Sequence, residues 1–145
     1  MRRAGVCALV LVLGTACAGG LTLEETTGVL RDDAAVLSRM ELDHKATAFT
    51  DDRSGCEAGA RRSVFTMTGD LPLGADPARA STALTSTLAT EFRTMGYQEA
   101  EGPHAQFGVN VSVLEKQSLG IVFTVAMRTR QPNVDISGKT GCLPE

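Results

Sequence analysis

Aromatic residues are scarce in this chain of 145 residues, which has no tryptophan, one tyrosine and five phenylalanines. The core must therefore be built mainly from Val, Leu, Ile, Met and Ala. Hydrophobic residues make up 43% of the sequence and charged residues 21%, which is ordinary for a globular protein. A chain of this length has room for one domain.

Basic residues are also few. The formal charge of −3 includes Arg2 and Arg3, and without these two residues 12 basic side chains (14 − 2) remain against 17 acidic ones, a balance of −5. Nucleic-acid binding needs a concentrated basic face that displaces counterions. We therefore expect no nucleic-acid partner.

Recognisable catalytic motifs are missing. The sequence has no Gly-x-Ser-x-Gly elbow, no phosphate-binding Gly-Lys loop and no His-Glu-x-x-His helix. Of its two histidines, His44 is expected to be partly buried on the apolar side of a helix, and His104 to lie in a loop with Glu99 and Glu101. A metal site needs three or four converging ligands, so we expect neither metal nor cofactor, and no enzyme.

The first twenty residues have three parts. Arg2 and Arg3 form a basic start, residues 4–13 are apolar, and residues 14–20 are small. This order is typical of a secretory signal peptide. The apolar run is too short for a membrane-spanning helix, which needs about 20 apolar residues.

The cleavage site has two readings. Residues 13–17, Leu-Gly-Thr-Ala-Cys, resemble the bacterial lipobox, in which a lipid is attached to the cysteine, here Cys17. Gly14 departs from that motif, where a branched aliphatic residue is usual. An ordinary signal peptidase could instead cut after Ala18 and release a secreted protein. The preferred division is a signal peptide at 1–16, a tether at 17–22 and one domain at 23–145.

Two cysteines remain beyond this boundary, Cys56 and Cys142. An even pair in an exported chain predicts one disulfide, which would close nearly the whole domain. A metal or catalytic thiol pair is disfavoured, because there is no Cys-x-x-Cys spacing and no histidine near either cysteine.

Apolar spacing predicts two helices. The first is expected over residues 23–49, followed by a loop at 50–56. The second opens at Asp76 and Pro77 and stops at Gly96, with an apolar stripe in between. These apolar positions are Leu84, Leu88, Phe92 and Met95.

Alternating patterns predict four strands, at residues 62–68, 107–113, 121–127 and 134–137. The expected order is α-β-α-β-β-β. The predicted fold is α+β, a two-layer sandwich with two helices on one face of a four-stranded, mainly antiparallel sheet.

A candidate ligand patch comes from arginines. Arg128 and Arg130 are expected on one strand face, and Arg61 and Arg62 begin another strand. If these strands are neighbours, the patch could hold an anionic lipid or polymer. A solvated sheet surface explains the same residues.

The lipobox-like Cys17, Ser-Gly-Cys at 54–56, Gly-Tyr at 96–97 and Thr-Gly-Cys at 140–142 resemble small uncharacterised actinobacterial envelope lipoproteins. The resemblance implies helices against a sheet, tied by one disulfide, on the outer face of the cell membrane. It carries over no functional residue. The leading hypothesis is a non-catalytic binding or accessory module whose partner is an envelope protein or an anionic lipid or polymer. An envelope or secreted hydrolase with an unrecognised site is the alternative.

Overall fold

A computed structural model of the protein describes residues 20–100 and 109–145. Its helices are α1 (Leu23–Leu37) and α2 (Pro77–Thr94), with a single 3-10 turn, η1 (Gln117–Leu119). The strands are β1 (Asp43–Asp52), β2 (Ala60–Asp70), β3 (Gln98–Glu99), β4 (Val109–Lys116), β5 (Ile121–Arg128), β6 (Val134–Lys139) and β7 (Leu143–Pro144). They form a seven-stranded sheet in the order β1-β2-β6-β5-β4-β3, with β7 paired to β2.

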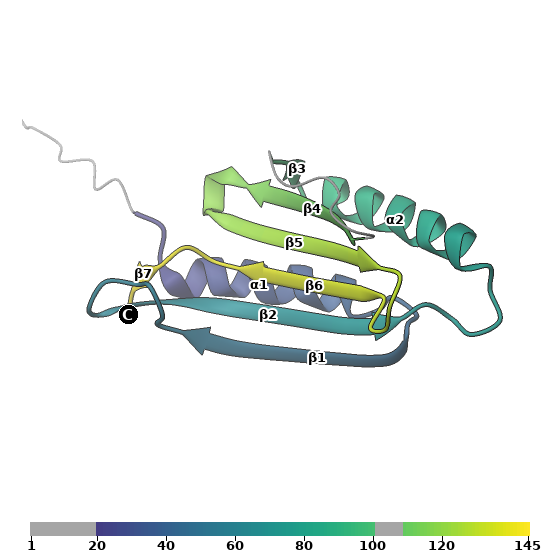
Figure 1. The fold of residues 1–145 in the computed structure, drawn as a ribbon. Coiled ribbons are helices and arrows are strands. Elements are labelled where there is room, and N and C mark those ends of the chain that lie inside the picture. Colours follow the sequence, from purple (N-terminus) through teal and green to yellow (C-terminus); the bar gives the residue numbers. More distant parts are fainter. Residues whose placement is uncertain (1–19, 101–108) are drawn as a thin grey trace, which may run out of the picture.

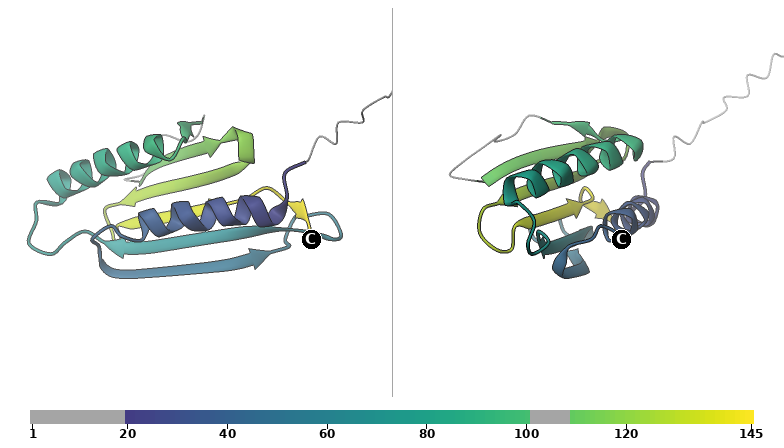
Figure 2. Two further views of the ribbon diagram at one scale, coloured as in Figure 1. Left: turned by 180° about the vertical axis from the view of Figure 1, so that it is seen from behind. Right: turned by 90° about the vertical axis from the view of Figure 1, so that its right-hand side faces the viewer.

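Both helices lie on one face of this antiparallel sheet (Figures 1 and 2). Helix α1 packs over β2 and β6, and α2 lies beside β4 and β5. The α+β prediction is confirmed. The prediction of four strands is wrong, because the sheet has seven.

The first helix is shorter than predicted. A capping box opens α1: the Thr22 side chain accepts a hydrogen bond from the Glu25 backbone, and the Glu25 side chain accepts one from the Thr22 backbone. The helix ends at Leu37, and the next residues turn the chain back toward the sheet. Residues 43–52, predicted as helix and loop, form β1 and pair with β2. Because most of β1 is exposed on both faces, its sequence carries no alternation of apolar and polar residues that would reveal a strand.

The second helix follows its local signals. The Asp76 side chain accepts a hydrogen bond from Arg79 N at 2.9 Å, and Pro77 occupies the first helical position. Gly96 follows with φ 88°, a left-handed conformation that glycine adopts at little cost. The predicted start and stop of α2 are confirmed.

Four of the few aromatic side chains gather at the centre of the core. The ring of Phe123 lies 5.2 Å from that of Phe92, 5.3 Å from that of Tyr97 and 6.4 Å from that of Phe65, measured between centroids. All three contacts are edge-to-face, a favourable geometry for aromatic pairs. A Cβ on Gly138 would lie 2.4 Å from the Phe123 ring, so glycine is required on β6 where the ring crosses it.

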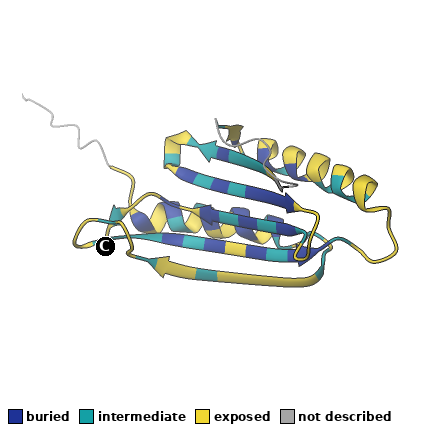
Figure 3. Ribbon diagram, in the orientation of Figure 1, coloured by how far each residue is buried: buried dark blue, intermediate teal, exposed yellow. Residues whose placement is uncertain are grey.

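The outer strand β1 contrasts with the rest of the sheet. Strand β2 buries alternate residues against the helices, whereas seven of the ten residues of β1 are exposed and the other three are half-buried (Figure 3). Helix α1 therefore covers little of β1.

Candidate functional site

An open groove of about 1030 Å³ lies between the first half of α1 and the adjacent ends of β1, β2 and β7. We call this part of the molecule the groove end; it comprises residues 21–31, 51–63 and 140–145. The walls include Glu24, Thr27 and Arg31 from α1, Asp51 and Arg61 from the strands, and Glu145. Leu21 and Thr22, which immediately precede α1, also line the groove.

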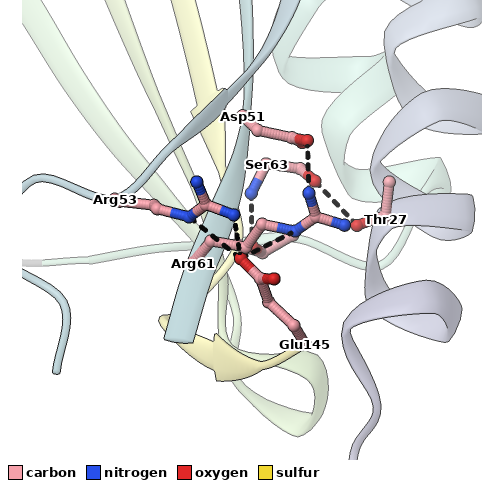
Figure 4. A network of polar contacts seen from close by, with 7 residues as sticks. Thr27, Asp51, Arg53, Arg61, Ser63 and Glu145 are labelled. Carbon is pink, nitrogen blue, oxygen red and sulfur yellow. Dashed lines mark hydrogen bonds and ion pairs between the residues drawn. The ribbon is translucent and has the colours of Figure 1, made fainter. Parts of the chain in front are cut away.

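Arg61 is the central cation of the groove. Its Nη1 donates a hydrogen bond to Asp51 Oδ2 at 2.8 Å (Figure 4). Its Nε is buried and has no hydrogen-bond partner among the described residues, since Glu145 Oε1 is 4.0 Å away. A buried unpaired donor costs about 1–3 kcal/mol, and the nearby carboxylate offsets part of that cost. Arg61 is therefore held between two acidic side chains without using all of its donors.

A second arginine connects the turn between β1 and β2 to the end of the chain. Arg53 donates from Nε to Glu145 Oε1 at 2.9 Å and also from Nη2. The hydrogen bond from Arg53 lowers the pKa of Glu145 and raises the pKa of the guanidinium itself. Both side chains are well exposed, so this pair orients the chain rather than stabilising it strongly.

The floor of the groove is made of hydroxyl groups that already have partners. The Ser63 and Thr27 hydroxyls are 2.8 Å apart, and the Ser63 backbone N–H donates to Thr140 Oγ1 at 3.0 Å. Ser63 is almost fully buried, and no titratable base contacts its hydroxyl in the described part of the chain. The serine is thus a structural link between α1 and β2, not an activated nucleophile.

The predicted disulfide is present at this end. Cys56 and Cys142 are joined with a Cα–Cα distance of 5.6 Å, across 86 residues of sequence. Cys56 lies in the turn between β1 and β2, and Cys142 immediately precedes β7. The bond fixes the two segments that carry Arg53 and Glu145. Cys17 lies outside the described residues, so its lipidation stays a prediction.

The arginine patch has a different layout from the one expected. Arg128 ends β5 and pairs with Asp135 at 3.1 Å, and Arg130 is exposed in the following turn, not on the strand. Strand β6 separates β5 from β2, and the pairing register places Arg61 and Arg62 at the opposite end of the sheet. The two arginine pairs therefore do not form one surface.

The expected position of His44 is wrong. The residue lies near the start of β1 with φ 50°, and its side chain is 74% exposed. Its Nδ1 is 3.0 Å from Oδ2 of Asp70, a nearly buried carboxylate that also accepts a hydrogen bond from the Asn133 backbone. The difference follows from the length of α1: the predicted helix includes residue 44, whereas α1 ends at Leu37. His104 lies outside the described residues, and Glu99 belongs to β3.

Sequence reasoning missed a buried polar cluster between α1 and β4. Asp33 accepts hydrogen bonds from the Tyr97 hydroxyl and from Lys116 Nζ, both at 2.8 Å. Burial, the hydrogen bond to Asp33 and the charge of Asp33 together raise the pKa of Tyr97, which stays neutral. The signal was the spacing of Asp33, three residues after Leu30 and four before Leu37 on the buried face. This cluster fixes α1 on the sheet.

A second cavity is too small for a ligand. It measures about 60 Å³, lies between α2 and β4–β5, and is mostly apolar, with Leu88, Phe92 and Leu114 among its walls. Ligand sites are usually about 300–1,000 Å³. The groove is therefore the better candidate site.

Chemical and family signals give no further assignment. Across residues 20–100 and 109–145, His, Cys, Asp and Glu side chains nowhere gather in a group of three that could hold a metal ion. No helix in these two ranges is long and apolar enough to cross a membrane. Comparisons with protein-family models, curated proteins and solved structures give no match.

Proposed function

We propose that this chain is a non-catalytic binding or accessory module, anchored to the outer face of the cell membrane by a lipid on Cys17, and that the groove is its binding site. The observation that carries the proposal is the position of the groove, which is lined in part by Leu21 and Thr22 at the end of the predicted tether. Two residues lie between Cys17 and Gly20, the first described residue, so the Cα atoms of Cys17 and Gly20 are at most about 11 Å apart. A ligand in the groove of the anchored protein would therefore lie close to the membrane surface.

The charges of the groove favour a protein partner. Side chains of both signs line it: Glu24, Asp51 and Glu145 are acidic, and Arg31 and Arg61 are basic. Such a surface suits a partner with charges of both signs better than a polyanion, which the acidic residues would repel. The Arg31 guanidinium also lies 4.9 Å from the centroid of the Phe49 ring, so it is held at the edge of the groove by a cation–π contact.

Arg128 and Arg130 are a second, less favoured contact surface for a binding module. They lie at the far end of the sheet and could contact an anionic lipid or polymer, although Arg128 is already paired with Asp135. Replacing both arginines with alanine should leave binding of the partner in the groove unchanged.

A hydrolase remains the second candidate because of one observation, the contact between His44 and the buried Asp70 carboxylate. A carboxylate that orients a histidine is part of the Ser-His-Asp arrangement. However, the other ring nitrogen, Nε2, makes no hydrogen bond to a serine, threonine or cysteine in the described part of the chain. We therefore favour binding over catalysis.

The anchor is tested by the intact mass of the protein from the membrane fraction of an exporting bacterial host. A mature chain that begins at Cys17 and carries acyl groups is the expected result. A chain that begins at Gly19 without lipid would contradict the anchor and indicate secretion.

The groove is tested by placing a photo-crosslinking amino acid in the full-length protein, in its native cell. Position Glu24 lies in the groove, and position Thr87 is an exposed control on α2. We expect a reproducible protein adduct from position 24 and none from position 87. Equal labelling from both positions, or none from either, would remove the support for the groove as a partner site.

A further inference from the structure

Strand β1 is the outermost strand at its side of the described sheet, and it is unusually open. It is ten residues long, and no described strand pairs with its outer edge. An exposed edge presents a row of free N–H and C=O groups that can pair with another strand. Proteins usually protect such edges with charges, bulges or proline.

Protection is present only at the two ends of β1. An irregularity in the pairing with β2 falls between Asp43 and Ala46, where His44 has φ 50°. Asp51 and Asp52 stand at the other end. The middle of the strand, residues 46–50, contains only alanine, threonine and phenylalanine and pairs regularly with β2. This central part can accept another strand.

We propose that β1 pairs antiparallel with β1 of a second copy of this chain, with Ala48 facing Ala48 across a two-fold axis. In that register, Lys45 of each copy lies opposite Asp51 of the other. The pairing is self-complementary, since the same Lys45–Asp51 pair arises once on each side of the axis. Each copy has one β1 edge, so pairing closes at a dimer and does not continue into a fibre.

Charge selects this register over its neighbours. Along a strand, only every second residue points its backbone N–H and C=O groups toward the outer edge. The pairing register of two β1 strands can therefore shift only by two residues at a time. Centring the pair on Phe49 would place Lys45 opposite Arg53, and centring it on Thr47 would place Asp51 opposite Asp43. Both alternatives bring like charges together, which is unfavourable across a strand pair.

Both charged side chains also have partners within their own chain. Lys45 Nζ donates to the carbonyl oxygens of Ser38 at 2.6 Å and Met40 at 2.8 Å, and Asp51 accepts from Arg61. The charges therefore act mainly through the repulsion that disfavours the other registers, while backbone hydrogen bonds along residues 46–50 hold the two strands together.

Two cysteine variants of the full-length protein test the register. Ala48 and Thr50 are both exposed residues with side chains on the same face of β1, and A48C and T50C differ only in position. In the proposed dimer the two positions 48 are directly opposite, whereas the two positions 50 are offset by four residues, about 13 Å. Cα atoms more than about 7 Å apart cannot be bridged by a disulfide.

On mild oxidation, we expect A48C to form a reducible dimer at least about tenfold more efficiently than T50C, seen on a non-reducing gel and by intact mass. Equal dimer formation by both variants, or none by either, would overturn the proposal.

Two lysine variants test the dimer without cysteine. A48K brings two positive charges together on the two-fold axis, whereas T66K adds the same charge to the same face one strand inward, directly beside Ala48. By sedimentation of the processed protein, we expect the wild type and T66K to be dimers and A48K a monomer. A wild type that sediments as a monomer, or an A48K variant as dimeric as T66K, would contradict the inference.

Discussion

Strand β2 has a polar cluster at each end, and the two clusters are built in different ways. At the groove end, Arg61 and Arg62 pair with Asp51 and Asp52 of β1 in ion pairs that are partly open to solvent. At the opposite end, the single nearly buried carboxylate of Asp70 accepts hydrogen bonds from His44 and from the Asn133 backbone. The first end is rich in charge and open; the second is compact and centred on one acceptor.

The difference indicates how an open groove can persist in a small domain. Exposed ion pairs contribute little to stability, usually less than about 1 kcal/mol each. The groove end has a covalent bond in addition, since Cys56 and Cys142 join the β1–β2 turn to the last strand. The disulfide can hold the walls in place while their polar groups stay available. Among the described residues, the opposite end has no disulfide and relies on hydrogen bonds to the nearly buried Asp70 carboxylate.

Removing the disulfide is the largest expected perturbation of this comparison. In the chain-entropy model, a loop of 86 residues corresponds to about 4–5 kcal/mol, less any strain in the folded state. In the double variant Cys56→Ser/Cys142→Ser, the free energy of unfolding measured by urea denaturation should be lower than in the wild type by about this amount. Reduced wild-type protein, the matched control, should behave in the same way.

Hydrogen exchange would show where that loss falls. Amides of β7 and of the first residues of β2 should lose protection before those around Asp70, because only the groove end is tied by the bond. Uniform loss of protection along β2 would mean that the two ends are one cooperative unit and that the contrast is wrong.

The parts of the fold that could be predicted are those with local or compositional signals. Helix α2 carries its own start in Asp76 and Pro77 and its own stop in Gly96. The disulfide followed from an even pair of cysteines in a chain that the sequence predicts to be exported. Strand β1 gave no such signal, because both of its faces are exposed and its sequence does not alternate. Strands β3 and β7 have two residues each, too few to show any period.

The groove could not be predicted because its walls come from three distant segments. Arg53 and Glu145 are 92 residues apart, and only the antiparallel sheet brings them together. Pairing partners of this kind depend on strand order, and the order β1-β2-β6 places the end of the chain beside the start of β2. Because β1 was not predicted from the sequence, neither this site nor the position of His44 could be predicted.

A smaller effect is expected from Asp70 at the compact end. Asp70→Ala leaves the Asn133 N–H and the His44 ring without their acceptor, which should cost about 1–3 kcal/mol in thermal or urea unfolding. Asp135→Ala is the matched control at the same end, because Asp135 forms an ion pair with Arg128 that is open to solvent and should cost at most about 1 kcal/mol. Equal losses in the two variants would show that the burial of Asp70 does not distinguish this end.

The smallest effect is a change in acid sensitivity at the groove end. Hydrogen bonds from the Ser54 hydroxyl and backbone, and then from Arg62, lower the pKa of Asp52 from 3.8 to about 2. A carboxylate with a lowered folded-state pKa adds stability above its ordinary pKa, and that stability is lost as the pH falls through the folded-state value. The contribution of Asp52 should therefore be complete above about pH 4 and disappear between about pH 4 and 2.

Ser54→Ala removes the first of these hydrogen bonds, so it should reduce the loss of stability over this interval, measured by urea unfolding at each pH. Ser86→Ala, an exposed serine on α2, should keep the wild-type pH profile. If Ser54→Ala and Ser86→Ala gave the same profile, the Ser54–Asp52 contact would not contribute to the stability of the groove end.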